Sequence, residues 1–444
     1  MTILPGIVII GGGLAGCEAA WQAANAGCTV TLYEMKPARF SPAHESESLA
    51  ELVCSNSFRS DAVTSAVGLL KEEMRILNSL VLYAAARTAV PAGKALAVDR
   101  LLFAEDITST LQQHPHITIH REEIMHLPET YATPYILATG PLTSDAMADS
   151  LSRLTGAERL SFYDAIAPIV EEDSLNRDIV YQKSRYDDGP GDYLNCPMSR
   201  EQYVDFIAAL RLAEQVPLHD FENVKYFEGC LPIEVMCERG EDTLRFGPMK
   251  PVGLPDPRTG RDPYAVVQLR RENLSGSHYN MVGFQTKLSY TAQKELFRTI
   301  PGMENARFSR LGSIHRNTFI RAPELLLPTL QLRHCSSLLI AGQLSGVEGY
   351  IESAAMGLLA GINGARLAMN DKAIVPPKDT ALGALINHLT TPSGKHFQPS
   401  NVNFSLFPPL QGKIAKKLRG QIRAEQALKS LRNWCTEEGV PVTT

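Results

Sequence analysis

The sequence predicts an α/β fold in which two separated stretches of chain build one Rossmann-like domain, interrupted by a mixed α+β domain. Three observations carry this prediction. Residues 7–34 combine an apolar strand, a glycine turn, an alanine-rich helix and a second apolar strand. Residues 337–367 again run from a buried strand through glycines into a helix of small residues. Residues 150–330, between these parts, change to proline turns and mixed strand and helix patterns.

The first glycine turn carries the most chemical information. Gly11 permits the tight turn, Gly13 would let the backbone approach a pyrophosphate, and Gly16 would let the helix pack against the strand. Leu14 and Ala15 open the helix, whose free N–H groups and positive dipole end attract phosphate. A glycine motif alone is weak evidence for a dinucleotide site. Here, however, the strand, the helix, the second strand and a terminal acid all follow at the expected spacing. The segment therefore predicts a bound dinucleotide.

The terminal acid is Glu34, at the position where a carboxylate accepts hydrogen bonds from a ribose 2′-hydroxyl. An acid there disfavours a 2′-phosphate, which predicts FAD or NAD rather than NADP. The strand that ends in Ala138-Thr139-Gly140 is typical of flavoproteins and favours FAD. The predicted cofactor-binding residues are Gly11, Gly12, Gly13, Leu14, Ala15, Gly16, Glu34, Gly342, Gly346, Gly349 and Tyr350.

The elements that follow the first unit are less regular. Residues 36–66 are polar and read as a long loop, and loops of this length are often functional. Helices are expected over about 68–87 and 98–113, then a strand over 117–120 and another over 134–140.

The domain prediction follows from these elements. A discontinuous FAD-binding domain comprises residues 1–150 and 331–444, and an insertion domain comprises residues 151–330. A chain of 444 residues can hold two or three domains.

Composition narrows the class of protein. Apolar content of 44%, charged content of 20% and a net charge of −5 are ordinary for a soluble globular protein. They give no global nucleic-acid signal, so an RNA partner needs a local basic patch. No apolar run approaches the roughly 20 residues that span a bilayer, and the opening segment lacks the basic region of a signal peptide. Eight scattered cysteines without CxxC pairs suggest reduced thiols in a cytoplasmic enzyme.

Five segments point to a known family: Leu52–Ser60, Phe227–Glu234, Leu244–Gly253, Met281–Lys287 and His315–Phe319. They closely resemble the folate- and FAD-dependent tRNA uracil-5 methyltransferases, which make ribothymidine in the T loop of bacterial tRNA. The resemblance runs over nearly the whole chain. The flavoproteins that install carboxymethylaminomethyl groups on wobble uridines are related to this family. Cys237 departs from the family pattern, where a small residue such as alanine is expected.

The resemblance implies a specific reaction. Methylenetetrahydrofolate supplies the carbon, FAD supplies electrons, and NADPH or NADH reduces the flavin. The target is C5 of the T-loop uridine, uridine 54 of tRNA. No metal and no membrane are expected.

The resemblance also implies that Cys54 and Cys230 are catalytic. A thiolate that adds to C6 of uracil makes C5 nucleophilic, and a thiolate also leaves readily. Local sequence alone leaves each cysteine open between this role and burial as a small hydrophobic residue. Cys230 is favoured as the nucleophile, with Cys54 assisting. Burial is expected for the others: Cys17, Cys28, Cys196, Cys335 and Cys435.

For several other residues, the sequence leaves both a functional and a structural interpretation open. Glu234 is either an acid–base group for the uracil or a solvated or salt-bridged carboxylate. Tyr350 either stacks on flavin or pterin or packs in the core. Lys287 and Arg316 either bind the folate tail or RNA phosphate, or form ordinary surface ion pairs.

A local basic patch lies near the C-terminus. Residues 413–432 hold seven basic side chains against one acid, with apolar residues near helical spacing from Ile414 onward. Phosphate neutralisation carries most non-specific RNA affinity, so Lys416, Lys417 and Arg419 are predicted RNA contacts. A solvated helix face is the alternative.

Three other functions remain open. The same chemistry could act on a uridine of ribosomal RNA. A flavoprotein that binds RNA without modifying it would not need Cys54 or Cys230. A generic NADH-dependent flavin oxidoreductase would not need the basic segment.

Overall fold

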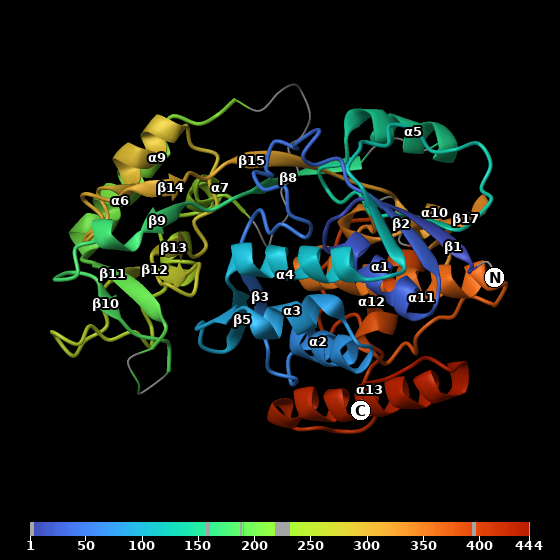
Figure 1. Cartoon of the computed structure of the whole chain (residues 1–444). Helices are drawn as coiled ribbons and strands as arrows, with labels where there is room; N and C mark the ends of the chain where they lie inside the picture. The colour runs from blue at the N-terminus through green and yellow to red at the C-terminus, as the bar shows by residue number, and fades with distance from the viewer. Residues whose placement is uncertain are drawn as a thin grey trace.

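The computed structural model describes residues 4–156, 160–186, 189, 191–217, 231–392 and 397–443. Figure 1 shows two lobes, one built on a parallel sheet and the other on an antiparallel sheet. The strand pair of β8 (Leu160–Ala165) and β15 (Ile314–Phe319) runs between the lobes. Each lobe has its own cluster of buried apolar side chains.

The parallel sheet joins chain from both ends of the sequence. In spatial order its described strands are β16 (Gln331–Leu332), β17 (Cys335–Ile340), β7 (Tyr135–Leu137), β1 (Gly6–Ile10), β2 (Thr29–Tyr33) and β6 (Ile117–His120). Neighbouring strands pair parallel, except that β16 is antiparallel to β17. The predicted strands in this part of the chain are confirmed. The α/β fold class is confirmed as well.

Helices α1 (Leu14–Asn25) and α11 (Tyr350–Ala368) lie side by side against this sheet. Their backbones touch at Gly357, where an added Cβ would come within 2.1 Å of the Ala15 carbonyl oxygen. Gly361 makes the same kind of approach to Ala19, at 2.6 Å from the carbonyl oxygen. Small residues on both helices therefore join the two separated parts of the chain.

The expected single helix over residues 68–87 is wrong. The structure has two helices, α2 (Ala66–Ile76) and α3 (Leu80–Arg87). Asn78 between them adopts a φ of 57°, and the Ser79 side chain accepts the N–H of Leu82 to cap α3. The buried carboxylate of Glu18 accepts further N–H groups at the start of α3, at 3.0–3.2 Å. The left-handed conformation of Asn78 and the cap by Ser79 thus divide the expected helix into two, although the apolar pattern continues.

Two further boundaries differ from the sequence prediction. The helix expected from residue 98 begins later, as α4 (Arg100–Gln113), because Asp99 caps it by accepting the N–H groups of its first turn. The expected loop over residues 36–66 contains β3 (Ser57–Ser60). This strand pairs with β5 (Ala95–Val98), which in turn pairs with β4 (Ala89–Val90).

The second lobe is an antiparallel sheet covered by helices. In spatial order its described strands are β10 (Tyr181–Gln182), β11 (Tyr193–Met198), β12 (Ala265–Arg271), β13 (His278–Met281), β9 (Ile169–Glu171) and β14 (Phe308–Arg310). Helices α6 (Arg200–Leu212) and α9 (Tyr290–Phe297) pack in this lobe (Figure 1). The proposed domain boundaries at residues 151 and 330 stay a prediction.

The other described helices are short or peripheral. They are α5 (Asp145–Thr155), α7 (Ile233–Glu238), α8 (Thr243–Phe246), α10 (Ala322–Leu325), α12 (Ala381–Thr390) and α13 (Arg419–Glu438), with single turns η1 (Glu172–Ser174), η3 (Gly342–Ser345) and η4 (Lys416–Leu418). Within the described residues, no helix is both long and apolar enough to cross a membrane.

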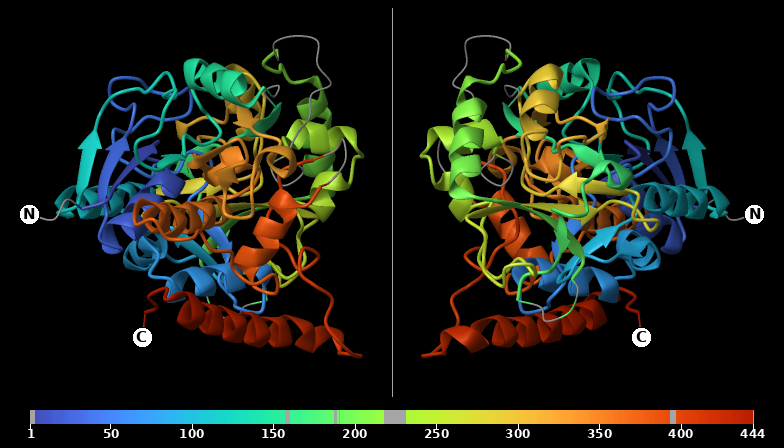
Figure 2. Two further views of the ribbon diagram at one scale, coloured as in Figure 1. Left: turned by 90° about the vertical axis from the view of Figure 1, so that its right-hand side faces the viewer. Right: turned by 90° about the vertical axis from the view of Figure 1, so that its left-hand side faces the viewer.

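Helix α13 lies along the base of the molecule in both views of Figure 2. It begins only at Arg419, so the helical spacing expected from Ile414 is wrong. Its packed face is made of later residues, Ala424, Ala427, Leu431, Trp434 and Cys435. Leu418 is exposed because it lies before the helix. The basic side chains around residue 416 are therefore held at an exposed helix start.

Candidate functional site

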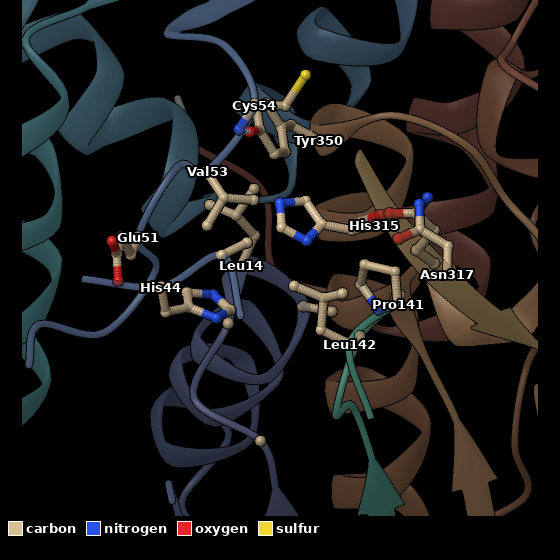
Figure 3. Close-up of a pocket in the computed structure, with 18 of the residues that line it drawn as sticks. Leu14, His44, Glu51, Val53, Cys54, Pro141, Leu142, His315, Asn317 and Tyr350 are labelled. Carbon is tan, nitrogen blue, oxygen red and sulfur yellow. Dashed lines mark hydrogen bonds between the residues drawn. The ribbon is translucent and has the colours of Figure 1, made fainter. Parts of the chain in front are cut away.

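A cavity of about 410 Å³ lies at the carboxyl ends of β1, β7 and β17. This is the edge of a parallel sheet where ligands bind in α/β folds. Ile10, Ala138 and Gly342, which follow or end these three strands, all line the cavity. Figure 3 shows that its walls also come from the long loop after β2 and from β15. Segments from both ends of the sequence and from the middle thus share one site.

The first glycine turn forms one end of this cavity. Gly11 has a φ of 107°, and an added Cβ there would lie 2.4 Å from the Ala138 carbonyl oxygen. Gly13 caps α1 without any side-chain hydrogen bond, so the first N–H groups of the helix remain available to a ligand. A Cβ at Gly13 would meet no atom within 4 Å. The turn is therefore tight on its sheet side and open on its cavity side.

The predicted cofactor residues divide into two sets. Those that line the cavity are Gly11, Gly12, Gly13, Leu14, Ala15, Glu34, Gly342, Gly349 and Tyr350. Gly16 and Gly346 do not line it. Gly16 lies so close to the turn that an added Cβ would sit 1.8 Å from the Gly11 carbonyl oxygen. Gly346 lies against the Phe397 ring, and a Cβ added at Gly346 would lie 2.6 Å from the nearest ring carbon.

Glu34 is buried at the edge of the cavity. Its carboxylate accepts the N–H of Gly12 at 2.8 Å and the N–H of Lys36 at 3.0 Å. These two bonds fix the acid beside the glycine turn. Each carboxylate oxygen has a second lone pair, so the group can still accept a hydroxyl from a ligand.

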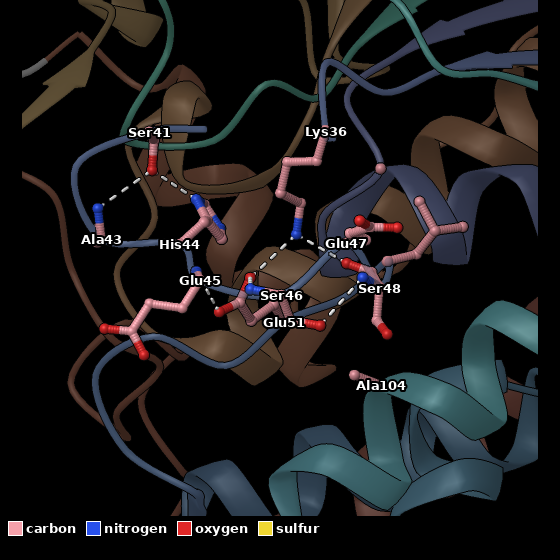
Figure 4. Close-up of polar contacts among 12 residues, drawn as sticks. Lys36, Ser41, Ala43, His44, Glu45, Ser46, Glu47, Ser48, Glu51 and Ala104 are labelled. Carbon is pink, nitrogen blue, oxygen red and sulfur yellow. Dashed lines mark hydrogen bonds and ion pairs between the residues drawn. The ribbon is translucent and has the colours of Figure 1, made fainter. Parts of the chain in front are cut away.

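The long loop after β2 is ordered by a polar network, shown in Figure 4. The Lys36 ammonium donates to the Ser48 carbonyl at 2.7 Å and pairs with the Glu51 carboxylate at 3.1 Å. The same carboxylate accepts the N–H groups of Glu45 and Ser46 at 2.9 and 3.2 Å. Lys36 and Glu51 both line the cavity. The predicted functional loop is thus a fixed wall of the site.

Two histidines line the cavity from different elements (Figure 3). His44 comes from the long loop, and its Nδ1 lies 2.5 Å from the Ser41 hydroxyl. His315 comes from β15, and its Nε2 lies 2.8 Å from the Ser313 hydroxyl. Burial lowers the pKa of His44, and burial beside a guanidinium lowers the pKa of His315 to about 4. The imidazole of His315 is therefore neutral at pH 7.

Cys54 lines the cavity at the end of the long loop and is half-buried. The Tyr350 phenol oxygen accepts the N–H of Cys54 at 2.7 Å and the N–H of Ser55 at 3.3 Å. The Cys54 sulfur lies 3.8 Å from the Ala165 carbonyl oxygen. Tyr350 also meets the Phe58 ring edge to face at 6.1 Å, and burial raises the pKa of its phenol. Tyr350 therefore positions the Cys54 backbone.

Two arginines, the buried Arg270 and the half-buried Arg100, hold the rest of the Cys54 segment. Arg270 donates to the Asn56 side-chain oxygen at 2.9 Å and to the Ser55 hydroxyl at 2.7 Å. Arg100 donates to the Leu52 carbonyl at 2.9 Å and to the Glu272 carboxylate at 2.8 Å. Burial lowers the pKa of Arg270. These guanidinium groups come from β12 and α4, so both lobes fix this loop.

The other cysteines are placed as follows. Cys230 lies outside the described residues. Burial is confirmed for Cys17, Cys28, Cys196 and Cys435, whereas Cys335 is half-buried. Cys237, the departure from the family pattern, is buried as well. Within the described residues, Cys54 is the cysteine that lines this cavity.

Glu234 has a buried, structural position. Its carboxylate accepts the hydroxyl of Thr286 and the N–H of Lys287, the latter at 3.3 Å. Burial raises the pKa of Glu234. Glu234 is therefore buried rather than solvated, and it does not line the cavity. Its bonds instead fix the segment that carries Gln285 to the cavity.

The predicted substrate and RNA residues lie away from the cavity wall. Lys287 is half-buried next to Glu234, and Arg316 is exposed on β15. Lys416, Lys417 and Arg419 are exposed around the start of α13. The structure does not bring these five side chains together into one site with Cys54.

Sequence reasoning missed several cavity residues. They are His44, Asp164, Arg270, His315, Asn317 and Glu348. His315, Asn317 and Glu348 stood inside segments already singled out, next to the residues that were chosen. Asp164 and Arg270 carried no local signal, because β8 and β12 reach the cavity only through the tertiary fold. Among the described residues, no group of three or more His, Cys, Asp or Glu is arranged to hold a metal ion.

Comparison with known proteins places this site in a family. The profile of the family described as Glucose inhibited division protein A matches residues 6–372. A protein of Desulfotalea psychrophila named methylenetetrahydrofolate–tRNA-(uracil-5-)-methyltransferase TrmFO is 66% identical over 96% of this chain and 96% of its own length. A protein of that name from Halalkalibacterium halodurans is 55% identical over 97% and 98% of the two chains.

The solved structures show the same fold. The structure of Aquifex aeolicus GidA in one crystal form has a TM-score of 0.72 at 18% sequence identity. The match covers 99% of this chain and 74% of the Aquifex chain.

Proposed function

This chain belongs to the family of glucose inhibited division protein A, and we propose that it methylates C5 of a uridine in tRNA. Methylenetetrahydrofolate is the carbon donor, FAD the flavin cofactor, and NADPH or NADH the reductant. The observation that carries the proposal is the position of Cys54 in one cavity with a dinucleotide-binding glycine turn. Relatives at 55–66% identity over nearly the whole chain bear the corresponding enzyme name, which supports it.

The residues present fit FAD. The N–H groups at the start of α1 face an open side of the turn and suit a pyrophosphate. Glu34 lies one strand away with lone pairs for ribose hydroxyls. Gly342, Gly349 and Tyr350 would border the ring end near Cys54. When bound, FAD supplies the electrons that convert a one-carbon unit at the methylene level to a methyl group.

The chemistry of the chain itself centres on thiols. A thiolate that adds to C6 of uracil raises electron density at C5, which is otherwise a poor nucleophile. Cys54 is a half-buried thiol that can reach a base placed in the cavity. We propose Cys230 as the second thiol and favour it as the nucleophile, with Cys54 assisting. The uridine must leave its stack to enter the cavity, as in other base-modifying enzymes.

We further propose that the exposed start of α13 binds RNA. Lys416, Lys417 and Arg419 are solvent-facing cations that can neutralise phosphates. Lys287 and Arg316 remain candidates for the folate tail or RNA phosphate. The described cysteines are free thiols, which fits a reducing compartment, and we infer a cytoplasmic location.

A methyl-transfer assay tests the proposed function. Purified protein receives FAD, NADPH, carbon-labelled methylenetetrahydrofolate and an unmodified tRNA transcript, and the nucleosides are separated. We expect label in 5-methyluridine at the T-loop uridine, uridine 54. A parallel reaction with ribosomal RNA controls for the target. Label in ribosomal RNA alone would reassign the substrate, and no label in either RNA would overturn the proposal.

A further inference from the structure

Glu348 is a buried carboxyl group of the cavity to which the proposed chemistry gives no task. It lies between η3 and the start of α11, is 5% exposed and lines the cavity. Its N–H donates to the Ser400 carbonyl at 3.0 Å, and its own carbonyl accepts the Asn401 side chain at 2.6 Å. The backbone on both sides of the side chain is therefore fixed. The carboxyl group has a defined place rather than a mobile one.

The surroundings of this carboxyl are polar and negatively charged. Its Oε2 accepts a hydrogen bond from the Gln343 amide at 2.6 Å. Asp164 on β8, Glu352 on α11 and Cys54 in the long loop are the titratable groups that act on it. Burial and these neighbours raise the pKa of Glu348 well above its ordinary value.

One oxygen of the neighbouring Glu352 carboxylate, Oε1, already has partners of its own. It pairs with the Arg59 guanidinium and accepts the N–H of Val402 at 2.9 Å. Arg59 therefore compensates Glu352 rather than Glu348. Burying a neutral carboxyl group in this enclosed site costs less free energy than burying a carboxylate. Burial therefore favours the protonated form of Glu348.

We propose that Glu348 is the proton donor of the cavity that Cys54 also lines, in the reaction proposed above. As the methylene carbon bonds to uracil C5, its two C–N bonds to folate break and each electron pair stays on its nitrogen. One of these nitrogens takes the Glu348 proton. The carboxylate left behind takes the proton that uracil C5 releases, so Glu348 ends the cycle protonated. The reduced flavin supplies the electrons, and solvent supplies the second proton of the folate nitrogens. This inference rests on the proposed function.

The substitution Glu348→Gln removes the transferable proton but keeps the size and shape of the side chain. Glutamine is neutral, has nearly the same size and still offers an oxygen to the Gln343 amide, so it mimics the protonated acid without a transferable proton. We expect normal FAD content, flavin reduction within about twofold and methyl transfer lowered by about 100-fold or more. Glu348→Asp keeps the proton and should retain intermediate activity. Methyl transfer by the wild type should fall as pH rises and Glu348 deprotonates.

The control variant is Glu295→Gln, an exposed acid on α9 in the other lobe. Methyl transfer by Glu348→Gln within threefold of wild type, with the same pH profile, would overturn the proposal. An activity-independent measurement is the infrared difference spectrum of wild type minus Glu348→Gln at pH 7. We expect a carboxylic acid C=O band, whereas a carboxylate band in its place would overturn the proposal. This spectrum tests Glu348 even if the wild type transfers no methyl group.

Discussion

At the scale of single residues, the proposed reaction depends on Cys54 and on the hydrogen bonds that hold its backbone. The sequence singled out Cys54 and Tyr350 but could not connect them, because 296 positions separate the two residues. Their contact exists only because α11 returns to the first glycine turn. The motif segments could therefore identify the participants, while the fold alone defines their geometry.

Replacing Cys54 by alanine should lower methyl transfer by at least about 100-fold, because a thiol in the cavity is lost. FAD content should stay near that of wild type, since the glycine turn is unchanged. Initial rates with labelled folate and tRNA provide the measurement. Cys335→Ala, at a half-buried thiol of β17 outside the cavity wall, is the matched control. Equal rates for Cys54→Ala and Cys335→Ala would remove Cys54 from the reaction.

Tyr350→Phe should destabilise the protein by about 1–3 kcal/mol, because two backbone N–H groups lose their acceptor. The affected groups are the N–H of Cys54 and of Ser55. Denaturant unfolding of the wild type and variant gives the free-energy difference. Tyr83→Phe, at a ring that is 58% exposed, serves as the control. A loss of stability as small as the control's would mean that Tyr350 does not hold this loop.

At the scale of elements, the closest approach between α1 and α11 is set by glycine. The sequence predicted both helices but not their contact, since a small-residue pattern fits many packing partners.

Gly357→Ala would place a Cβ 2.1 Å from the Ala15 carbonyl oxygen, and the backbone there cannot move aside at low energetic cost. We expect lower thermal stability and weaker FAD retention. At Gly364 the nearest atom is the flexible Ile136 side chain at 3.1 Å, so Gly364→Ala should be milder. The reverse order would show that this helix contact is not tight.

The pH dependence of stability should report on the contact between α2 and α12. Glu73 on α2 accepts the N–H groups of Ala381 and Leu382 at 2.6 and 2.9 Å, and burial raises its pKa from 4.5 to about 8. In that pH window the folded protein binds a proton that the unfolded chain has released. The free energy of unfolding should therefore fall as pH rises from about 4.5 to 8, by about 1.4 kcal/mol per unit at most.

Glu73→Gln cannot titrate and should flatten this part of the stability curve, which denaturant unfolding at several pH values would reveal. Glu105→Gln, at an exposed acid of α4, should leave the slope as in wild type. An unchanged slope in Glu73→Gln would mean that Glu73 titrates normally. This site could not be predicted from the sequence, because a glutamate within a helical pattern is usually expected on the surface.

At the scale of the whole molecule, residues from both lobes line one cavity, where the proposed function requires RNA and folate to meet. In the parallel-sheet lobe, the order of strands and helices was largely predictable from apolar periodicity and glycine turns. For residues 151–330 only a mixture of strands and helices was predicted. The helix break at Asn78 and the true start of α13 were not, because caps and left-handed residues compete with periodicity. Asp164 and Arg270 could not be predicted as cavity residues, since tertiary folding alone brings them there.

Neutralising Lys416, Lys417 and Arg419 together should weaken tRNA binding and lower its salt dependence. Each lost phosphate contact should reduce the slope of log K against log salt by about 0.7–0.9. Binding measured at several salt concentrations gives this slope, and folate-independent flavin reduction should stay unchanged. Lys294→Ala, on an exposed face of α9, is the control. An unchanged slope in the triple variant would leave the basic helix start as a solvated surface.

The proposed function requires one cavity to hold both FAD and the Cys54 thiol. A crystal structure of the protein purified with FAD tests this most directly. The account predicts the pyrophosphate at the N–H groups of Gly13 to Ala15, the ribose beside Glu34, and the flavin ring in contact with Cys54 and Tyr350. A flavin bound elsewhere, or with its ring turned away from Cys54, would contradict the account.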